Sequence, residues 1–514
     1  MTIAYISPEL ALPELVYSGG LGYLAHSYGL SAKSLGLDAV IVSILYRQSF
    51  DQIIEDGKMR TQYTTRSYGE SGLEDTGIVF PLDINGAENL IKVWRLKGHD
   101  DMVPIYLLDA DLPENDELGR LNTLQLYGGS VESGANLERW IAYAIILGEG
   151  SVEALRRLGI SVDLYHLNES YLAFAAMKIA DPSKTVFTTH TPVPSGNKKF
   201  DLATVHKILG GRYSLEYLNE LGGDPFDMAA ACIKLSRKVN AVSKKHLDTI
   251  EKMWGWVENR PPFVAVTNGV NKEYWQYPEF ASAKTPSELA GAQKIYKRKL
   301  IDYGKEKTGI YLSENVLTIV CARRAAKYKR PTLIFFDKPW IKNLLFSNSL
   351  QIIMSGRPHP DDREMIDEFN YILKLSRELP NLVVLENYDM EQSKILKGGA
   401  DIWLNNPRAP MEASGTSGMS AALNGAINLS TPDGWMPEAN PENCFLFGSS
   451  YSFGNTHDAY DAKELKTALS HIIAMRRKEP DAFYRKAFAA KIEAEDQWTS
   501  DRMVKEYETL LYAA

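Results

Sequence analysis

Cysteine is scarce in this chain, and its three copies are too far apart to form a recognisable site. Cys232, Cys321 and Cys444 show no C-x-x-C spacing, so neither a disulfide framework nor a zinc site is indicated. A reducing, cytoplasmic setting fits this usage of cysteine. We therefore expect no metal site.

Long apolar runs and a leader pattern are missing as well. No stretch approaches the ~18 consecutive apolar residues of a membrane span, and the first residues lead directly into a strand pattern without the features of a secretion signal. Positive charge is not in excess either, since the formal net charge is −8. These absences argue against a membrane and against nucleic acid as partners, but they leave room for a local phosphate site.

With 514 residues, of which 45% are hydrophobic and 24% charged, the chain exceeds the size of a single core. Short apolar strands alternate with helical patterns in both halves, which predicts two doubly wound α/β domains. A polar, Pro-punctuated stretch at residues 275–285 predicts the hinge. We expect domains at residues 1–285 and 286–494, with a helix at 495–514 returning to the first. Residues 50–105 indicate a β-rich insertion without assignable chemistry.

A glycine-rich turn follows the first predicted strand. Gly19, Gly20 and Gly22 lie between a strand at residues 2–6 and a predicted helix. Their missing Cβ atoms allow a phosphate to approach the amides at the helix N-terminus, but tight turns need glycine too. From the residues alone, both explanations stay open.

Polar residues also end two later strands of the first half. His166, Asn168 and Glu169 indicate either a polar cluster at the crevice of the sheet or ordinary strand-end hydrogen bonding. His190 follows the next strand in a loop stiffened by Pro192 and Pro194, and such rigidity suits a residue that positions a ligand.

The stretch at residues 405–435 organises the second half. Glu412 precedes a predicted helix of small residues. The segment from Ser414 to Ser417 presents amides and hydroxyls at the helix N-terminus, where the macrodipole favours an anion. The plain alternative is that Ser and Thr only cap the helix. A carboxylate at this turn suits the binding of ligand hydroxyl groups.

Five cations fall within eight residues, directly after a predicted central strand. They are Arg323, Arg324, Lys327, Lys329 and Arg330. A charge run is usually a solvated helix face, but cations at the carboxyl end of a strand face the crevice of an α/β sheet. Because Arg and Lys suit phosphate groups, this position favours a phosphate site.

These segments together resemble the α-glucan phosphorylases, which are retaining enzymes of the GT-B fold. The likeness rests on YSGGLGYLA at 17–25, T-H-T-P-V-P at 189–194, T-N-G-V at 267–270, A-R-R-x-x-x-Y-K-R at 322–330 and E-A-S-G-T-x-x-M at 412–419. It spans nearly the whole chain. The resemblance implies two Rossmann-like domains that face each other across a cleft binding a sugar joined to a phosphate.

The resemblance also implies roles for the matched residues. His190 is expected to contact the transferred glucose and Asn268 a sugar hydroxyl, whereas a cationic pair binds phosphate. We predict as catalytic residues His190, Arg324, Lys329 and Glu412, as substrate-binding residues Asn268, Ser414 and Gly415, and as phosphate-binding residues Gly19, Gly20, Gly22, Thr416 and Ser417.

One residue implied by the resemblance is absent. The family binds pyridoxal phosphate through a lysine whose position is Ser420 here, and no lysine occurs between Arg408 and Trp435. A Schiff base needs a primary amine, so we expect no lysine-bound cofactor at this position, and noncovalent capture stays open. Tyr171 and Asn197 replace two histidines that are usual in the family.

Three functions remain open. The first is a retaining glucosyltransferase that uses a nucleotide sugar, the second a true α-glucan phosphorylase, and the third a non-catalytic glucan-binding protein. The expected partners are a sugar phosphate or nucleotide sugar and an α-glucan or another sugar acceptor. Assembly into a homo-oligomer is left open.

Overall fold

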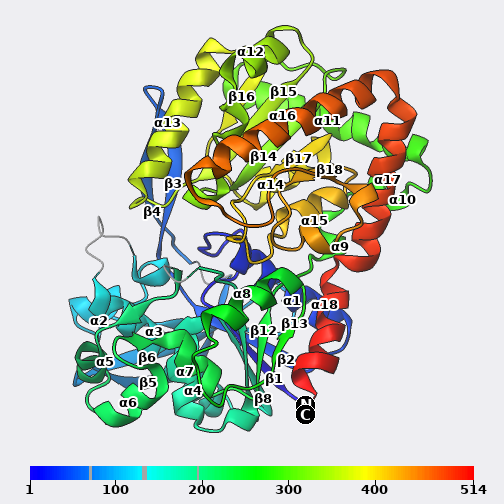
Figure 1. Cartoon of the computed structure of the whole chain (residues 1–514). Helices are drawn as coiled ribbons and strands as arrows, with labels where there is room; N and C mark the ends of the chain where they lie inside the picture. The colour runs from blue at the N-terminus through cyan, green and yellow to red at the C-terminus, as the bar shows by residue number, and fades with distance from the viewer. Residues whose placement is uncertain (69–71, 130–135, 194–195, 514) are drawn as a thin grey trace. The chain divides into compact units, whose positions relative to one another are not determined.

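The computed structural model describes residues 1–68, 72–129, 136–193 and 196–513 (Figure 1). Pro194 of the predicted rigid loop lies outside these residues. The chain forms two compact units: unit 1 is Met1–Ser49, Tyr63–Thr267 and Met503–Ala514, and unit 2 is Phe50–Gln62 and Asn268–Arg502. The main division thus follows Thr267, earlier in the chain than the predicted boundary after residue 285.

Unit 1 is built on a sheet that has nine strands in the described residues, in the order β13-β12-β9-β8-β1-β2-β7-β6-β5. The strands from β13 to β7 run parallel, and β6 and β5 extend the sheet antiparallel. The strands are β1 (Ile3–Ile6), β2 (Ala39–Ile44), β5 (Leu73–Ile84), β6 (Ala87–Leu96), β7 (Ile105–Asp109), β8 (Leu164–Asn168), β9 (Thr185–Thr189), β12 (Lys238–Ala241) and β13 (Phe263–Ala265). A separate pair is β10 (Lys199–Phe200) and β11 (Phe226–Asp227).

Helices alternate with these strands. They are α1 (Gly20–Ser34), α2 (Glu117–Leu121), α3 (Leu137–Arg157), α4 (Ala173–Ile179), α5 (Leu202–Ile208), α6 (Leu215–Gly222), α7 (Met228–Lys234) and α8 (Lys244–Met253). Every residue of β2, with sequence AVIVSI, is buried, as expected of a parallel strand covered on both faces. The Asn136 side chain accepts a hydrogen bond from the Arg139 amide and so caps α3.

The end of the chain packs into the core of unit 1. Helix α18 (Ser500–Glu506) leads into a final turn, Tyr507–Tyr512. Tyr507 and Tyr512 are buried with Tyr5 and Tyr28, and the Tyr512 hydroxyl lies 2.8 Å from Nδ1 of His166. The segment that belongs to unit 1 begins at Met503, whereas the predicted returning helix began at residue 495.

Unit 2 has a parallel sheet of six strands in the described part of the chain, in the order β16-β15-β14-β17-β18-β19. The strands are β14 (Thr318–Arg324), β15 (Gln351–Arg357), β16 (Leu382–Leu385), β17 (Ile402–Asn405), β18 (Ile427–Ser430) and β19 (Phe445–Leu446). The helices are α9 (Lys272–Trp275), α10 (Pro278–Ser282), α11 (Pro286–Thr308), α12 (Lys338–Phe346), α13 (Arg363–Glu378), α14 (Met390–Gly399), α15 (Ser417–Ala422), α16 (His457–Lys478) and α17 (Pro480–Gln497). The predicted α/β class with two doubly wound Rossmann-like units is confirmed.

An early hairpin, β3 (Gln48–Glu55) and β4 (Lys58–Thr65), belongs mostly to unit 2. Figure 1 shows it beside α13. The Met59 amide donates to Oδ1 of Asn370 at 2.7 Å, and the Gln52 side chain donates to the Pro358 carbonyl at 2.8 Å. The predicted insertion at residues 50–105 is therefore not one element, since β5 and β6 join the sheet of unit 1.

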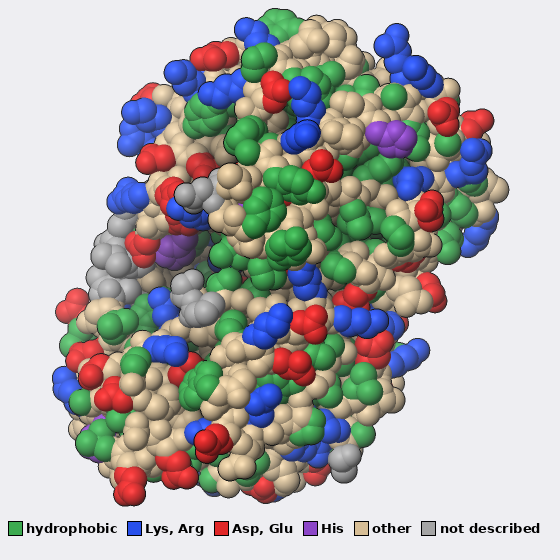
Figure 2. Space-filling model, in the orientation of Figure 1, with side chains coloured by type: hydrophobic (Ala, Val, Ile, Leu, Met, Phe, Trp, Pro, Cys, Tyr) green, Lys and Arg blue, Asp and Glu red, His purple; other side chains and the backbone are tan. Residues whose placement is uncertain are grey.

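Charged side chains of both signs are interspersed over the face shown in Figure 2. None of the described helices combines the length and the apolar character that crossing a membrane requires. Within the same described residues, no three His, Cys, Asp or Glu side chains are grouped so that they could bind a metal ion.

Candidate active site

The structure separates the five clustered cations by their partners. Arg323 is buried and donates to the Leu404 carbonyl at 2.6 Å and to the Asn405 side chain at 2.9 Å. Lys327 pairs with Glu364 at the surface, 2.8 Å apart. Neither of these two cations is therefore directed mainly toward a ligand.

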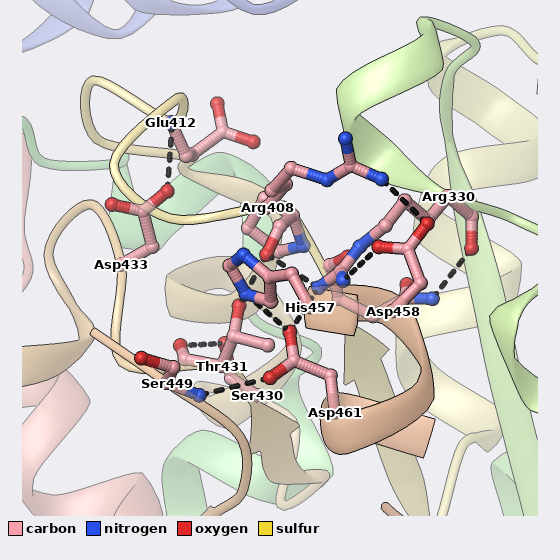
Figure 3. A network of polar contacts seen from close by, with 12 residues as sticks. Arg330, Arg408, Glu412, Ser430, Thr431, Asp433, Ser449, His457, Asp458 and Asp461 are labelled. Atoms are coloured by element: carbon pink, nitrogen blue, oxygen red, sulfur yellow. Dashed lines mark hydrogen bonds and ion pairs between the residues drawn. The ribbon is translucent and has the colours of Figure 1, made fainter. Parts of the chain in front are cut away.

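Arg330 is buried and forms the centre of a network of ion pairs (Figure 3). Its guanidinium lies 2.8 Å from Asp458 and 2.7 Å from Asp461, both on α16. Asp458 also pairs with Arg408, which lies in the loop before Glu412. Arg330 therefore fixes the loop that carries Lys329 instead of binding phosphate.

Lys329 and Glu412 form a partly buried ion pair. Their Nζ and Oε2 atoms are 3.0 Å apart, and each side chain is 14% exposed. Burial lowers the pKa of Lys329, although Glu412 opposes this shift. Burial by itself raises the pKa of Glu412, but the charges of Lys329, Arg323 and Arg324 outweigh it, so that this pKa is lowered. The Glu412 carboxylate is thus ionised at neutral pH, and the exposed Arg324 adds its positive charge near this carboxylate.

Several contacts orient Glu412. Its amide donates to Oδ2 of Asp433 at 2.8 Å, and the Tyr328 hydroxyl lies 3.4 Å from Oε1. Gly434 has φ +60°, and a Cβ there would lie 2.1 Å from the Ser414 carbonyl oxygen. Only glycine allows this close approach. Asp433, Tyr328 and Gly434 were not among the predicted site residues, although they lie in the segments D-G-W at 433–435 and Y-K-R at 328–330.

The predicted ligand groups around α15 differ in their availability. Ser414 is 3% exposed, and its Oγ has no hydrogen-bond partner among the described residues, so a ligand could satisfy it. Gly415 has φ +78° and lies against the Glu412 side chain. Ser417 Oγ already lies 3.2 Å from Nε1 of Trp403, and Thr416 makes no side-chain cap. Since α15 has six residues, its dipole is small, and the phosphate role of these two residues stays a prediction.

Ser420 does not fit a lysine-bound pyridoxal phosphate. It is 1% exposed, and its hydroxyl donates to the carbonyls of Thr416 at 3.2 Å and Ser417 at 3.1 Å. This is ordinary back-bonding within a helix. The side chain offers no primary amine, and its hydroxyl is already used.

In unit 1, His190 is held in one tautomer. Its Nε2 lies 2.7 Å from Oδ1 of Asn168, whose amide donates to Ser7 at 3.1 Å. Since Oδ1 can only accept, Nε2 carries the proton and Nδ1 presents a lone pair. Burial and the neighbouring His246 lower the pKa of His190 to about 3, so the ring is neutral.

Glu169 supports the same loop, because its Oε1 accepts from the His190 amide at 2.7 Å. His166 has different partners, Thr188 and Tyr512. Of the predicted strand-end cluster, Asn168 and Glu169 therefore orient His190, and His166 is structural. Asn197, another departure from the family, donates to the Val193 carbonyl at 3.3 Å.

A carboxylate that the sequence analysis did not predict bonds to the glycine turn. Oε2 of Glu9 accepts from the amides of Ser18 at 2.6 Å and Gly19 at 3.1 Å. A Cβ at Gly22 would lie 3.1 Å from the Ala11 amide, whereas one at Gly20 would meet nothing within 4 Å. Gly22 thus serves close packing, Gly19 is already bonded, and Gly20 keeps the most space for a ligand.

Asn268 is 5% exposed, and its Oδ1 has no hydrogen-bond partner among the described residues. Its carbonyl accepts from Arg502 at 3.0 Å. Asn268 is the first residue of unit 2 after the chain leaves unit 1 at Thr267. A buried amide oxygen without a partner suits recognition of a hydroxyl donor.

Two known family models match this chain, one in each half. Residues 374–510 match the carbohydrate phosphorylase family model, and residues 2–256 match the starch synthase catalytic domain. Maltodextrin phosphorylase of Thermococcus litoralis is 31% identical over 99% of this chain and 70% of its own length. The chain belongs to the carbohydrate phosphorylase family.

Two further relatives are similar over most of this chain. Glycogen phosphorylase of Aquifex aeolicus is 27% identical over 91% of this chain and 79% of its own length. An uncharacterized protein of Methanocaldococcus jannaschii is 35% identical over 99% of both chains. Family membership confirms the expected GT-B type of fold and an enzyme of the glycosyltransferase or phosphorylase type that transfers glucosyl units.

Proposed function

We propose that this protein is a retaining glucosyltransferase that takes glucose from a nucleotide sugar and passes it to an α-glucan or a related acceptor. The observation that carries the proposal is that Ser420 offers no amine, whereas the charged residues Lys329, Arg324 and Glu412 are all present. A phosphorylase of this family depends on a cofactor phosphate that Ser420 cannot anchor covalently.

The cations supply the electrostatic part of the reaction. The bond between C1 of glucose and the diphosphate oxygen breaks, and the diphosphate leaves with the electron pair. Lys329 and Arg324 neutralise the charge that develops on this oxygen. The acceptor hydroxyl bonds to C1 on the same face, and its proton passes to the departing diphosphate.

Neutral and anionic acceptors of hydrogen bonds orient the sugar. Glu412, which is paired with Lys329, accepts hydrogen bonds from ligand hydroxyls, and the unpartnered Oγ of Ser414 offers a second hydrogen-bonding group. In the proposed role, Nδ1 of His190 accepts from a glucose hydroxyl, and the side chain of Asn268 binds another. Such fixed partners lower the entropic cost of reaching the reactive geometry.

A donor screen tests the proposal. Glucan with orthophosphate is compared with maltodextrin plus each nucleotide-activated glucose, and product is followed by release of glucose 1-phosphate or of the nucleoside diphosphate. We expect turnover with a nucleotide sugar. Turnover only with orthophosphate would identify a true phosphorylase, and silence in both reactions would favour a non-catalytic glucan-binding protein.

A further inference from the structure

The turn that carries Lys329 ends in a backbone conformation that is uncommon for its residue. Lys329 is the last residue of the short turn Lys327–Lys329, and Arg330 follows it with φ +46°, in the left-handed region. A residue with a Cβ atom keeps this conformation only where contacts from outside the turn hold it there. The position of the Lys329 amine therefore depends on the partners of Arg330.

The loop that leads to the second member of the ion pair supplies several of these partners. Arg330 donates to the carbonyls of Asn406 and Pro407, each at 3.0 Å, and the Asn406 side chain donates back to the Arg330 carbonyl at 2.7 Å. The Arg408 amide donates to the Tyr328 carbonyl at 2.7 Å. The turn and the loop are thus bonded to each other along their length, so a displacement of one displaces the other.

One carboxylate of α16 binds both segments at once. Oδ1 of Asp458 lies 2.8 Å from the Arg330 guanidinium, and Oδ2 accepts from the guanidinium of Arg408 (Figure 3). Burial by itself raises the pKa of Asp458, but the hydrogen bonds from the two arginines outweigh it, so that this pKa is lowered. Asp458 is therefore an anion at neutral pH, and it bridges the two segments by charge-assisted hydrogen bonds.

The neighbouring carboxylate, Asp461, has a different place in the network. It is fully buried and lies 2.7 Å from the Arg330 guanidinium. Nε2 of His457 lies 2.9 Å from the same carboxylate, and the Phe453 ring stacks on the His457 ring at 4.8 Å. The side chain of Asp458, in contrast, is 36% exposed. Removing the charge of Asp458 therefore leaves Arg330 with a buried carboxylate partner, and the fold should survive the change.

We propose that Asp458 is a positioning residue for glucosyl transfer, which fixes the Lys329 amine opposite the Glu412 carboxylate by holding Arg330 and Arg408 together. The inference rests on the proposed function in taking Lys329 as a cation that neutralises the departing diphosphate. Asp458 acts through these side chains and takes no part in the bond changes. Because a fixed charge acts mainly on the transition state, loss of Asp458 slows the transfer more than it weakens donor binding.

A kinetic comparison tests this role, with Asp458→Asn and Asp458→Glu as variants and UDP-glucose and ADP-glucose as donors. Glu364→Gln is the matched control, because Glu364 pairs at 2.8 Å with Lys327 of the same turn. We expect Asp458→Asn to lower kcat about tenfold or more with little change in KM for the donor. Asp458→Glu should recover most of this loss, and Glu364→Gln should match the wild type. An equal loss in the control, or a raised KM with unchanged kcat, would overturn the proposal.

Chemical labelling tests the position of Lys329 without any turnover. The full-length protein is acetylated by limiting acetic anhydride in competition with a free amine, and mass spectrometry gives the relative rate at Lys329. We expect this amine to react about fivefold faster in Asp458→Asn and in Arg408→Gln, because the turn opens more often, and at the wild-type rate in Glu364→Gln. Arg408→Gln breaks the same bridge at its other end, so it keeps the test decisive if Asp458→Asn fails to fold.

The two measurements also separate this inference from the proposed reaction. Unchanged acetylation of Lys329 in both Asp458→Asn and Arg408→Gln would overturn the positioning role. If acetylation changes as expected but the wild type transfers glucose from neither donor, the proposed function fails and the positioning of Lys329 by Asp458 stands.

Discussion

Removing one partner of the Lys329–Glu412 pair should cost more than removing both. At 3.0 Å and an effective dielectric constant of about 20, the attraction is roughly 5 kcal/mol before desolvation is counted. A buried charge left without its partner typically costs ~3–5 kcal/mol. Because Arg323 and Arg324 also act on Glu412, we expect Lys329→Met to be milder than Glu412→Gln, which leaves three cations together.

The measurement is a double-mutant cycle on Lys329→Met, Glu412→Gln and the double variant. Hydrogen exchange at amides of residues 405–420 reports local stability, which avoids a two-state assumption for a protein of two units. We expect a coupling energy of about 1.5–3 kcal/mol between the two positions. Tyr311→Ala, which removes an exposed aromatic side chain elsewhere in unit 2, serves as the control for both measurements.

The reasoning predicts a parallel pattern in activity. Both single variants should lower kcat by about a hundredfold or more, since each removes a charge from the site of charge development. Additive stability effects, with a coupling energy below about 0.5 kcal/mol, would show that the two side chains do not depend on each other. Full activity in Glu412→Gln would exclude its proposed role.

Three further predictions follow from single residues. Wild-type protein that is incubated with pyridoxal phosphate and reduced with borohydride should carry no covalent label on helix α15 of unit 2, whereas Ser420→Lys should carry one, as detected by mass spectrometry. A label on that helix in the wild type would contradict the expectation that Ser420 prevents covalent attachment. Lys397 is 2% exposed, with its amine 3.4 Å from the centre of the Trp275 ring, and burial lowers its pKa well below the usual value. Because the folded-state pKa lies below the unfolded value of about 10.4, burial of this amine destabilises the fold at low pH, and the penalty disappears as pH rises through the unfolded pKa. Lys397→Met should therefore raise the midpoint of thermal unfolding below about pH 10 and flatten its rise with pH, and an unchanged pH profile would contradict the assignment. Asn168→Asp should raise the pKa of His190 and lower kcat/KM by about tenfold or more as the ring becomes protonated. NMR titration of the histidine checks the pKa, and an unshifted titration would show that Asn168 does not set the protonation state of the His190 ring.

The alternation of strands and helices was predictable from the sequence, because buried parallel strands appear as continuous apolar runs. Such runs can be recognised without knowing which distant residues they contact. The sorting of the cations was not. Arg330 and Lys329 are neighbours in sequence, yet one is bound by carboxylates of α16, more than a hundred residues away, and the other by Glu412. Nothing in the local charge pattern distinguishes these two outcomes.

The glycine turn illustrates the same limit. Its spacing indicates a close backbone approach, but the pattern does not say whether the approaching group is a ligand or part of the protein. Glu9, ten residues earlier than Gly19, supplies the carboxylate that bonds to the turn. Tautomer selection at His190 likewise depends on Asn168, which belongs to a neighbouring strand.

The hairpin β3–β4 has a practical consequence for anyone who wishes to divide this protein. Because residues 50–62 belong to unit 2, the polypeptide passes between the units four times, and neither unit is one uninterrupted piece of sequence. A fragment that stops at Thr267 keeps the Met59 amide but loses its acceptor on Asn370. Expressing the two halves as separate fragments should therefore give aggregation-prone proteins, unless the hairpin is removed from the first fragment and joined to the second.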